Sequence, residues 1–205
     1  GLRDFLLDHA QFVLSWKNKQ GKLEVPPLLE DRPTGVYVRW GHEEGASVHH
    51  DHTLACITEA GVPIDFPVRT PGRPNLKLRS MIDQAIFDFD LDERETEWSA
   101  MAFGLWLAPT VKHWENGQHR QLNFDRIAER QMRGGKEYGV CGGTHRVYSL
   151  MVLLRLDDKY DILSDKMHDE VYAYLGTVRD ILEVTQFEDG HWPYNWPDGQ
   201  EAKDN

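Results

Sequence analysis

The expected fold of this chain rests on one short stretch, Gln186-Phe187-Glu188-Asp189-Gly190-His191-Trp192. It places a glutamine, three residues, a glycine, one residue and a tryptophan in order. The stretch directly follows a long predicted helix, which Ser164 caps and which carries an apolar stripe from Met167 to Leu182. The tail from Asp189 to Asn205 is rich in Pro and Gly and then polar, so we expect its end to fray.

Apolar residues recur at helical spacing in six further segments. The additional predicted helices cover residues 3–19, 50–60, 76–89, 94–107, 123–132 and 145–156. Asn123 and Thr144 stand where N-caps are expected, because their side-chain oxygens accept hydrogen bonds from free N–H groups of the first turn. Residues 21–47 are rich in Gly, Pro and charge. They predict mostly loop, with a short extended piece at Val36-Tyr37-Val38.

This pattern predicts an all-α fold built of helix pairs, in a single domain over residues 1–205 that could be a fragment of a longer protein. A faint internal repeat supports the pairing: His52, Trp98 and His145 begin apolar helices 46 and 47 residues apart. A period of about 45 residues is typical of two-helix repeats. If the three helices are equivalent, their N-terminal ends converge and favour polar or anionic ligands.

The spacing from Gln186 to Trp192 resembles the QW motif of squalene and other terpenoid cyclases, whose α/α-toroid architecture is shared with protein prenyltransferases. Gly176 lies near a small-residue position of the pattern, whereas Ile181 stands where the family usually places an aromatic residue. The resemblance covers residues 176–192 and beyond them only the helix pattern. It implies helical hairpins that form an α/α toroid or partial toroid, in which Gln186 and Trp192 brace the fold and are not catalytic.

Charge and composition exclude several functions. The net charge of −11 and the pI near 5.3 argue against binding to nucleic-acid phosphates. No apolar run is long enough to cross a bilayer, so we expect a soluble protein with no membrane span. The glycines form neither a dinucleotide-binding nor a Walker pattern, and no cofactor is predicted. The compartment and the oligomeric state stay open.

In a toroid, the three helices that begin near His52, Trp98 and His145 would form the inner ring. The histidines and aromatics suggest a ligand-binding or catalytic cavity at the N-terminal ends of these inner helices. In that cavity His52, His145 and Glu97 would act as acid–base groups. Further residues would line it and hold an apolar or sugar-like ligand, namely His50, Trp98, Asp189, His191 and Trp192. The alternative is a non-catalytic interaction scaffold, for which some of the seven Trp side chains would be anchors.

The densest ligand-like cluster is His49-His50-Asp51-His52, with Glu43 and Glu44 upstream. Neutral imidazoles and carboxylates suit zinc or another divalent transition metal, so a third hypothesis is a metal-dependent hydrolase that uses His49, His50 and His52. No His-Glu-x-x-His or Cys-x-x-Cys pattern accompanies the cluster. A loop-to-helix junction capped by Asp51 explains the same residues without a metal, and we predict no metal site.

Overall fold

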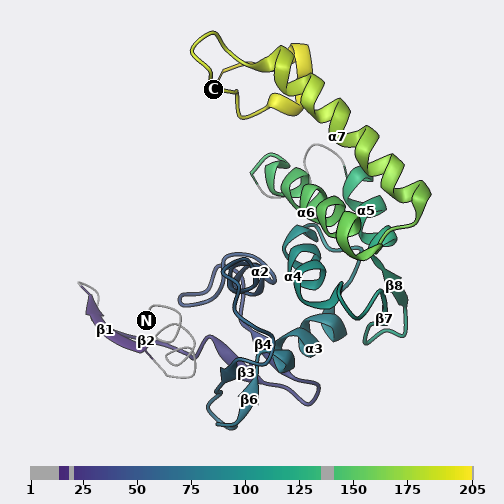
Figure 1. Ribbon diagram of the computed structural model, residues 1–205. Helices are drawn as coiled ribbons and strands as arrows, with labels where there is room; N and C mark the ends of the chain where they lie inside the picture. The colour runs from purple at the N-terminus through teal and green to yellow at the C-terminus, as the bar shows by residue number, and fades with distance from the viewer. Residues whose placement is uncertain (1–13, 19–20, 135–140, 205) are drawn as a thin grey trace. The chain divides into compact units, whose positions relative to one another are not determined.

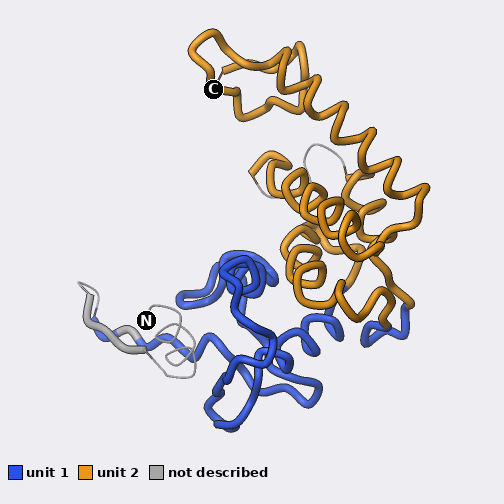
Figure 2. Tube along the Cα trace, in the orientation of Figure 1, with its two compact units in different colours: residues 1–89, 115–120 blue, residues 90–114, 121–205 orange. Residues whose placement is uncertain are grey.

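The computed structural model describes residues 14–18, 21–134 and 141–204 (Figure 1). The chain forms two compact units (Figure 2). Unit 1 takes its described residues from 1–89 and 115–120, and unit 2 from 90–114 and 121–205. A single domain over residues 1–205 stays a prediction.

The described residues contain six α-helices, one 3-10 helix and eight short strands, which pair into four two-stranded sheets. The all-α prediction is therefore wrong, and with it the α/α toroid or partial toroid of helical hairpins. The strands are two to five residues long. Pairing with a partner strand satisfies their backbone N–H and C=O groups, and so short a segment carries too few residues for a period-2 pattern to be read.

Unit 1 holds three antiparallel strand pairs. They are β1 (Leu14–Asn18) with β2 (Gly21–Val25), β3 (Leu29–Asp31) with β4 (Val36–Val38), and β5 (Pro67–Val68) with β6 (Leu76–Lys77). The helix predicted over residues 3–19 is wrong from Leu14 to Asn18, and residues 1–13 lie outside the described part of the chain. Gly21, with φ +132°, adopts a backbone conformation that other residues avoid, just where the chain enters β2. The extended piece predicted at Val36–Val38 is confirmed as β4.

The described part of unit 1 also contains the helices α2 (His52–Glu59) and α3 (Arg79–Asp88). They confirm the helices predicted over residues 50–60 and 76–89, although Leu76 and Lys77 pair in β6 before α3 begins. Helix α3 packs against β4. The buried apolar side chains of these elements are Val36, Val38, Leu54, Met81, Ile82 and Ala85.

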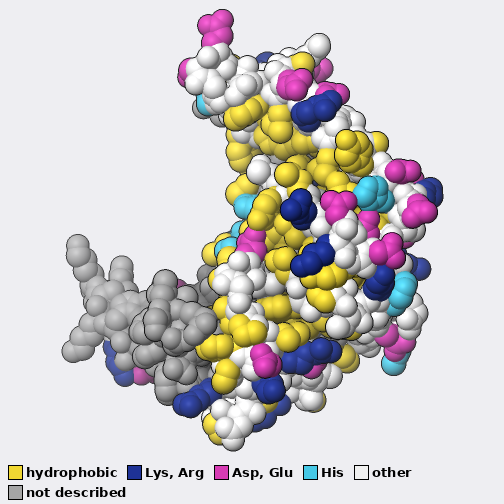
Figure 3. Space-filling view, viewed as in Figure 1, with side chains coloured by type: hydrophobic (Ala, Val, Ile, Leu, Met, Phe, Trp, Pro, Cys, Tyr) yellow, Lys and Arg dark blue, Asp and Glu magenta, His cyan; other side chains and the backbone are white. Residues whose placement is uncertain are grey.

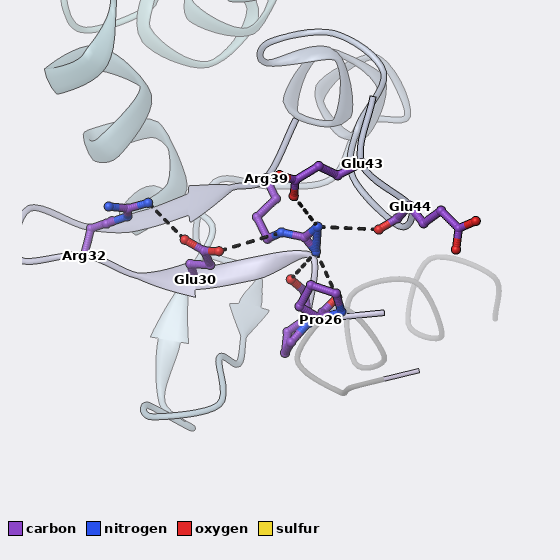
Figure 4. A network of polar contacts seen from close by, with 7 residues as sticks. Pro26, Glu30, Arg32, Arg39, Glu43 and Glu44 are labelled. Carbon is purple, nitrogen blue, oxygen red and sulfur yellow. Dashed lines mark hydrogen bonds and ion pairs between the residues drawn. The ribbon is translucent and has the colours of Figure 1, made fainter. Parts of the chain in front are cut away.

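A buried arginine holds the irregular part of unit 1 (Figure 4). Arg39 follows β4 and is only 5% exposed. Its guanidinium donates hydrogen bonds to the carbonyl oxygens of Pro26 at 3.0 Å and Pro27 at 3.2 Å. It also donates to the Glu43 carboxylate at 3.2 Å and lies 3.7 Å from a carboxylate oxygen of Glu30. Buried carbonyls need donors, and arginine supplies five in a fixed geometry.

The backbone of Arg39 is fixed as firmly as its side chain. Its N–H donates to the Leu28 carbonyl at 2.9 Å, and its carbonyl accepts from the Ser47 N–H at 2.8 Å. The residue therefore ties the segment before β3 to the segment that leads into α2. We infer that Arg39 determines the course of residues 26–47, where the local sequence favours loop.

Unit 2 consists mainly of helices, which run as follows: α4 (Glu97–Leu107), α5 (Phe124–Arg133), α6 (Thr144–Tyr160), α7 (Asp165–Thr185) and the 3-10 helix η1 (Trp196–Glu201). Strands β7 (His113–Glu115) and β8 (Gln121–Asn123) pair with each other. The predicted caps of α5 and α7 are confirmed, since the Asn123 side chain accepts from the Arg126 N–H and the Ser164 hydroxyl from the Met167 N–H.

Helix α6 departs from its prediction at both ends. Its N-cap is Gly143 in a left-handed conformation, φ +86°, and Thr144 is the first helical residue. The Asp157-Asp158 pair does not end the helix, which continues to Tyr160. An aspartate near a helix C-terminus is disfavoured by the helix dipole, but Asp157 is held by specific contacts. Its carboxylate accepts from the Leu163 N–H and contacts His168.

The core of unit 2 lies around α4, where nine of eleven residues are buried. Helix α4 packs closely on α6 at Gly104, because a Cβ there would lie 2.9 Å from Leu156 and 3.2 Å from Leu153. Helix α7 contacts α5, α6 and η1. It buries only Met167, Val171, Val178 and Thr185. Within the described chain, no helix has the length and apolarity needed to span a membrane.

We predict that Arg39→Met strongly destabilises unit 1. The change leaves the carbonyls of Pro26 and Pro27 without their donor, at a cost of about 3 kcal/mol in the free energy of unfolding. Chemical denaturation gives that free energy, and amide hydrogen exchange locates the loss in unit 1. Arg32→Met is the matched control: Arg32 is exposed and pairs with Glu30 at the surface, so its loss should cost under about 1 kcal/mol. Equal costs for the two variants would contradict the role given to Arg39.

The Asp157–His168 contact gives unit 2 a pH dependence. The two side chains lie 2.6 Å apart, and this hydrogen bond raises the pKa of His168 above its ordinary 6.5. Asp158 and Asp169 raise the pKa further, while burial opposes the shift. A group whose pKa is raised by folding stabilises the fold fully below its unfolded pKa. The stabilisation is lost as the pH rises through the folded pKa.

We predict that His168→Asn removes this pH dependence, because asparagine still donates a hydrogen bond to Asp157 but does not titrate. The excess stability of the parent protein over the variant should be largest near about pH 5 and should decrease toward about pH 9. Urea denaturation across that pH range measures it. A difference that grows with rising pH would show that the sign of the His168 shift is wrong.

Candidate functional site

An open groove lies between α6 and α7 in unit 2. Its volume is about 420 Å³, and its wall is mostly apolar. The apolar lining residues are Val147, Met151, Leu175, Val178, Leu182 and Trp192. Arg179, Glu183 and Gln186 are its polar members. Figure 3 shows hydrophobic side chains gathered over α6 and α7 on the visible face.

The helical period explains why these residues share one wall. On α7, Leu175, Val178 and Leu182 are separated by three and four residues, so they form one stripe. On α6, Val147 and Met151 are four residues apart, so they lie on the same face, about one turn from each other. Met151 is 55% exposed and Trp192 46% exposed. An apolar surface of this kind that stays in contact with water is typical of a binding site.

Trp192 lines the groove, and two hydrogen bonds fix the turn that carries it. Its indole N–H donates to the Leu182 carbonyl at 2.8 Å, and the Gln186 side-chain amide donates to the Gly190 carbonyl at 3.0 Å. Gly190, with φ +94°, has the left-handed conformation that this turn requires. Gln186 and Trp192 thus brace the chain where it leaves α7. This agrees with a structural role, although the contacts lie within one helix end and its turn.

Asp189 and His191 form a second cluster in the same turn. His191 Nδ1 lies 2.5 Å from Asp189, its Nε2 lies 3.4 Å from Asp204, and its ring stacks on Phe187 with centroids 4.4 Å apart. The hydrogen bond to Asp189 raises the pKa of His191 and lowers that of Asp189. Of the predicted ligand-binding residues in this turn, the described lining of the groove includes Trp192 but neither Asp189 nor His191.

The structure brings two of the predicted site residues of unit 2 together. The rings of Trp98 and His145 lie 4.5 Å apart, at the starts of α4 and α6. Glu97, beside Trp98, is 1% exposed. His145 Nδ1 is buried, and within the described chain it has no hydrogen-bond partner. An acid–base role for Glu97 and His145 stays a prediction. His52 belongs to unit 1, so a shared site with them stays a prediction as well.

The histidines of the unit 1 cluster make contacts with other aromatic rings. His50 is buried and stacks on Trp40 with centroids 5.0 Å apart, while His49 and His52 meet edge to face at 5.8 Å. Asp51 is the N-cap residue of α2 as predicted, but its side chain makes no capping hydrogen bond because its backbone is left-handed. Among the described residues, no group of three or more His, Cys, Asp or Glu is arranged to hold a metal ion.

His50 and Asp51 also line a small internal cavity, which the sequence did not predict. Tyr37, Gln84 and Asp88 are among its other lining residues. Its volume of about 10 Å³ leaves room for no more than about one water molecule. Burial raises the pKa of Tyr37. The cavity is therefore too small for an organic ligand, and the groove in unit 2 is the better candidate site.

The fold and the groove define a protein of mixed helices and small sheets with an open apolar site in its helical unit. No protein-family model, curated protein or solved structure matches the chain. The resemblance of residues 176–192 to terpenoid cyclases and prenyltransferases therefore stays untested, whereas the toroid that it implied is wrong.

Sequence reasoning placed Trp192 in a ligand site but missed the rest of the groove. The signal was present in α6, which carries apolar residues on more than one face. Leu150, Leu153 and Leu156 are buried in the core, while Val147 and Met151 are not. A helix with more apolar surface than one core face needs is a sign of a second contact surface.

We predict that Trp192→Phe destabilises the turn of residues 186–192, which carries the Trp192 wall of the groove. Phenylalanine keeps an aromatic ring but lacks the N–H that binds the Leu182 carbonyl, which should cost about 0.5–1 kcal/mol in the free energy of unfolding. Thermal denaturation measures the change, and faster hydrogen exchange of amides in residues 186–192 locates it. Tyr194→Phe, a change at an exposed residue of the same tail, should have no effect. Unchanged exchange in Trp192→Phe would mean that the indole bond does not hold the turn.

Proposed function

We propose that unit 2 binds a small apolar ligand in the groove between α6 and α7. The observation that carries the proposal is the combination of a volume of about 420 Å³ with a lining of six apolar side chains. Sites for small organic molecules have volumes of about 300–1,000 Å³ and walls that are mainly hydrophobic and aromatic. Filling the groove would remove the exposed surfaces of Met151 and Trp192 from water, at about 25 cal/mol per Å² of apolar area.

The polar residues of the groove indicate what the ligand looks like. Arg179 and Glu183 lie 3.9 Å apart, and Arg179 also donates to the Asp180 carboxylate at 2.6 Å. The positive charge of Arg179 is thus offset by its own neighbours, which disfavours a strongly anionic ligand. Gln186 is the C-cap residue of α7, and its backbone is extended. The geometry fits a ligand with an uncharged apolar body and a polar substituent directed to this side.

This proposal keeps the apolar ligand that the sequence predicted but moves its site to α6 and α7. It assigns no catalytic role to His52, His145 or Glu97. The interaction scaffold remains as a second candidate, because Tyr172, Val184 and Tyr194 are also exposed and lie outside the described lining of the groove. A sugar-like ligand fits this wall poorly, since its hydroxyls would meet few polar partners.

Binding of N-phenyl-1-naphthylamine, a neutral apolar fluorophore, tests the proposal. We predict that the protein enhances its fluorescence saturably, and that Met151→Asp weakens binding about tenfold because a charge in the apolar wall must be desolvated. Met151 is more than half exposed, so the variant should fold. Circular dichroism checks this point.

Tyr172→Asp is the matched control. Tyr172 is a 70% exposed apolar residue of α7 that lies outside the groove lining. The affinity of the Tyr172→Asp variant for the fluorophore should equal that of the parent protein. Lack of saturable binding to the parent protein, or equal weakening by both substitutions, would rule out the groove as the ligand site and favour the scaffold.

A further inference from the structure

Unit 1 contains a second, chemically different pocket. It is open and has a volume of about 550 Å³. Its walls are the second half of α3, the turn at Thr34 and the loop between β7 and β8. The lining residues on α3 are Asp83, Ile86 and Phe87. Glu115, the last residue of β7, and Asn116, Gly117 and His119 of the loop line the other side. Unlike the groove in unit 2, this pocket combines one exposed aromatic ring with two carboxylates.

The aromatic ring of Phe87 lies against Gly117 and is 44% exposed. Gly117 lies against it so closely that a Cβ at this position would be 2.7–2.8 Å from three ring atoms. The Gly117 N–H donates to the Phe87 carbonyl at 2.8 Å. The glycine backbone therefore supports one part of the ring, while the rest stays open to the pocket. Such a ring offers a flat apolar surface to a ligand.

The loop that carries Gly117 is itself held rigidly. The buried side chain of Asn116 donates to the Phe89 carbonyl at 2.8 Å. Its oxygen accepts from the N–H groups of Gln118 and Arg120 at 3.0 and 2.9 Å. One amide thus fixes the loop turn and ties it to the end of α3. A pocket that is formed before its ligand arrives loses little conformational entropy on binding.

Each carboxylate of the pocket already has a partner. Asp83 accepts from the Arg79 guanidinium at 2.8 Å, and Glu115 lies 2.7 Å from His119 Nδ1. A carboxylate has about four acceptor positions, so it can accept from a ligand as well as from protein donors. The partners orient both carboxylates, and the Arg79 guanidinium offsets the charge of Asp83. Both effects favour a neutral ligand with several hydroxyl donors over a cation, which would compete with Arg79 for Asp83.

We propose that this pocket binds one ring of a saccharide. The apolar face of a pyranose, made of C–H groups, packs on Phe87, and its hydroxyls donate to Asp83 and Glu115. Hydrogen bonds to charged acceptors are stronger than those between neutral groups, and a planar ring selects the flat side of the sugar. This site is separate from the groove of unit 2, and its ligand is polyhydroxylated where that of the groove is apolar.

Saturation-transfer difference NMR with methyl glycosides of glucose, galactose, mannose and xylose tests the assignment. We expect saturation of the ring protons on one face of at least one glycoside. Phe87→Ala should reduce this signal about tenfold, equivalent to about 1.4 kcal/mol. Trp40→Ala, a change at an aromatic residue of unit 1 that is equally exposed, should leave the signal unchanged.

A second variant separates binding from folding. Gly117→Ala keeps every lining side chain but pushes the Phe87 ring aside, so it should abolish the signal while the melting temperature changes little, since a half-exposed ring has room to move. Absence of a signal from all four glycosides, or an equal loss in Phe87→Ala and Trp40→Ala, would overturn the proposal. A further result would also overturn it: n-butylammonium binds, its binding weakens with salt and depends on Phe87, and no glycoside binds. This result would show that the pocket is a cation site.

Discussion

The hydrogen bond from the Trp192 indole to the Leu182 carbonyl determines the shape of the candidate site. Helix α7 is 21 residues long but buries only four of them. The other apolar residues in the second half of α7 are only partly covered. The chain that follows α7 supplies part of this cover. At the end of α7, the Leu182 carbonyl accepts from both the Gln186 N–H and the Trp192 indole. This pair of bonds turns the chain back and makes Trp192 a wall of the groove.

The two units are stabilised in different ways. Unit 2 depends on apolar packing around α4, where glycine at position 104 permits close contact with α6. Unit 1 has short strands and long irregular segments, so many of its carbonyls lack partners in regular structure. The buried guanidinium of Arg39 supplies several of the missing donors at once (Figure 4). A buried polar group of this kind is favourable only when its hydrogen bonds are satisfied, which is the case here.

Local signals in the sequence predicted part of this architecture. The caps at Asn123 and Ser164 were found because the interaction spans three residues and is visible in the sequence itself. Apart from β4, the strands were missed because a strand depends on its pairing partner, which local sequence does not show. The apolar residues of β1, for example, also fit a helix. Trp98 and His145 were assigned to one cavity from the sequence, and their rings meet, but the cavity itself stays a prediction. The groove was not predicted. It depends on how α6 and α7 pack, and one helix alone does not reveal which of its apolar faces stays uncovered.

The most direct measurement is the detection of intermolecular nuclear Overhauser effects between a bound apolar ligand and protein labelled with ¹³C at the methionine methyl groups. Met151 lines the groove, whereas Met81 and Met101 are buried in the cores of units 1 and 2. The account predicts contacts from N-phenyl-1-naphthylamine to the methyl group of Met151 and to the ring of Trp192, and none to the buried methionines. Contacts to Met81 or Met101 without contacts to Met151 would contradict a ligand site between α6 and α7.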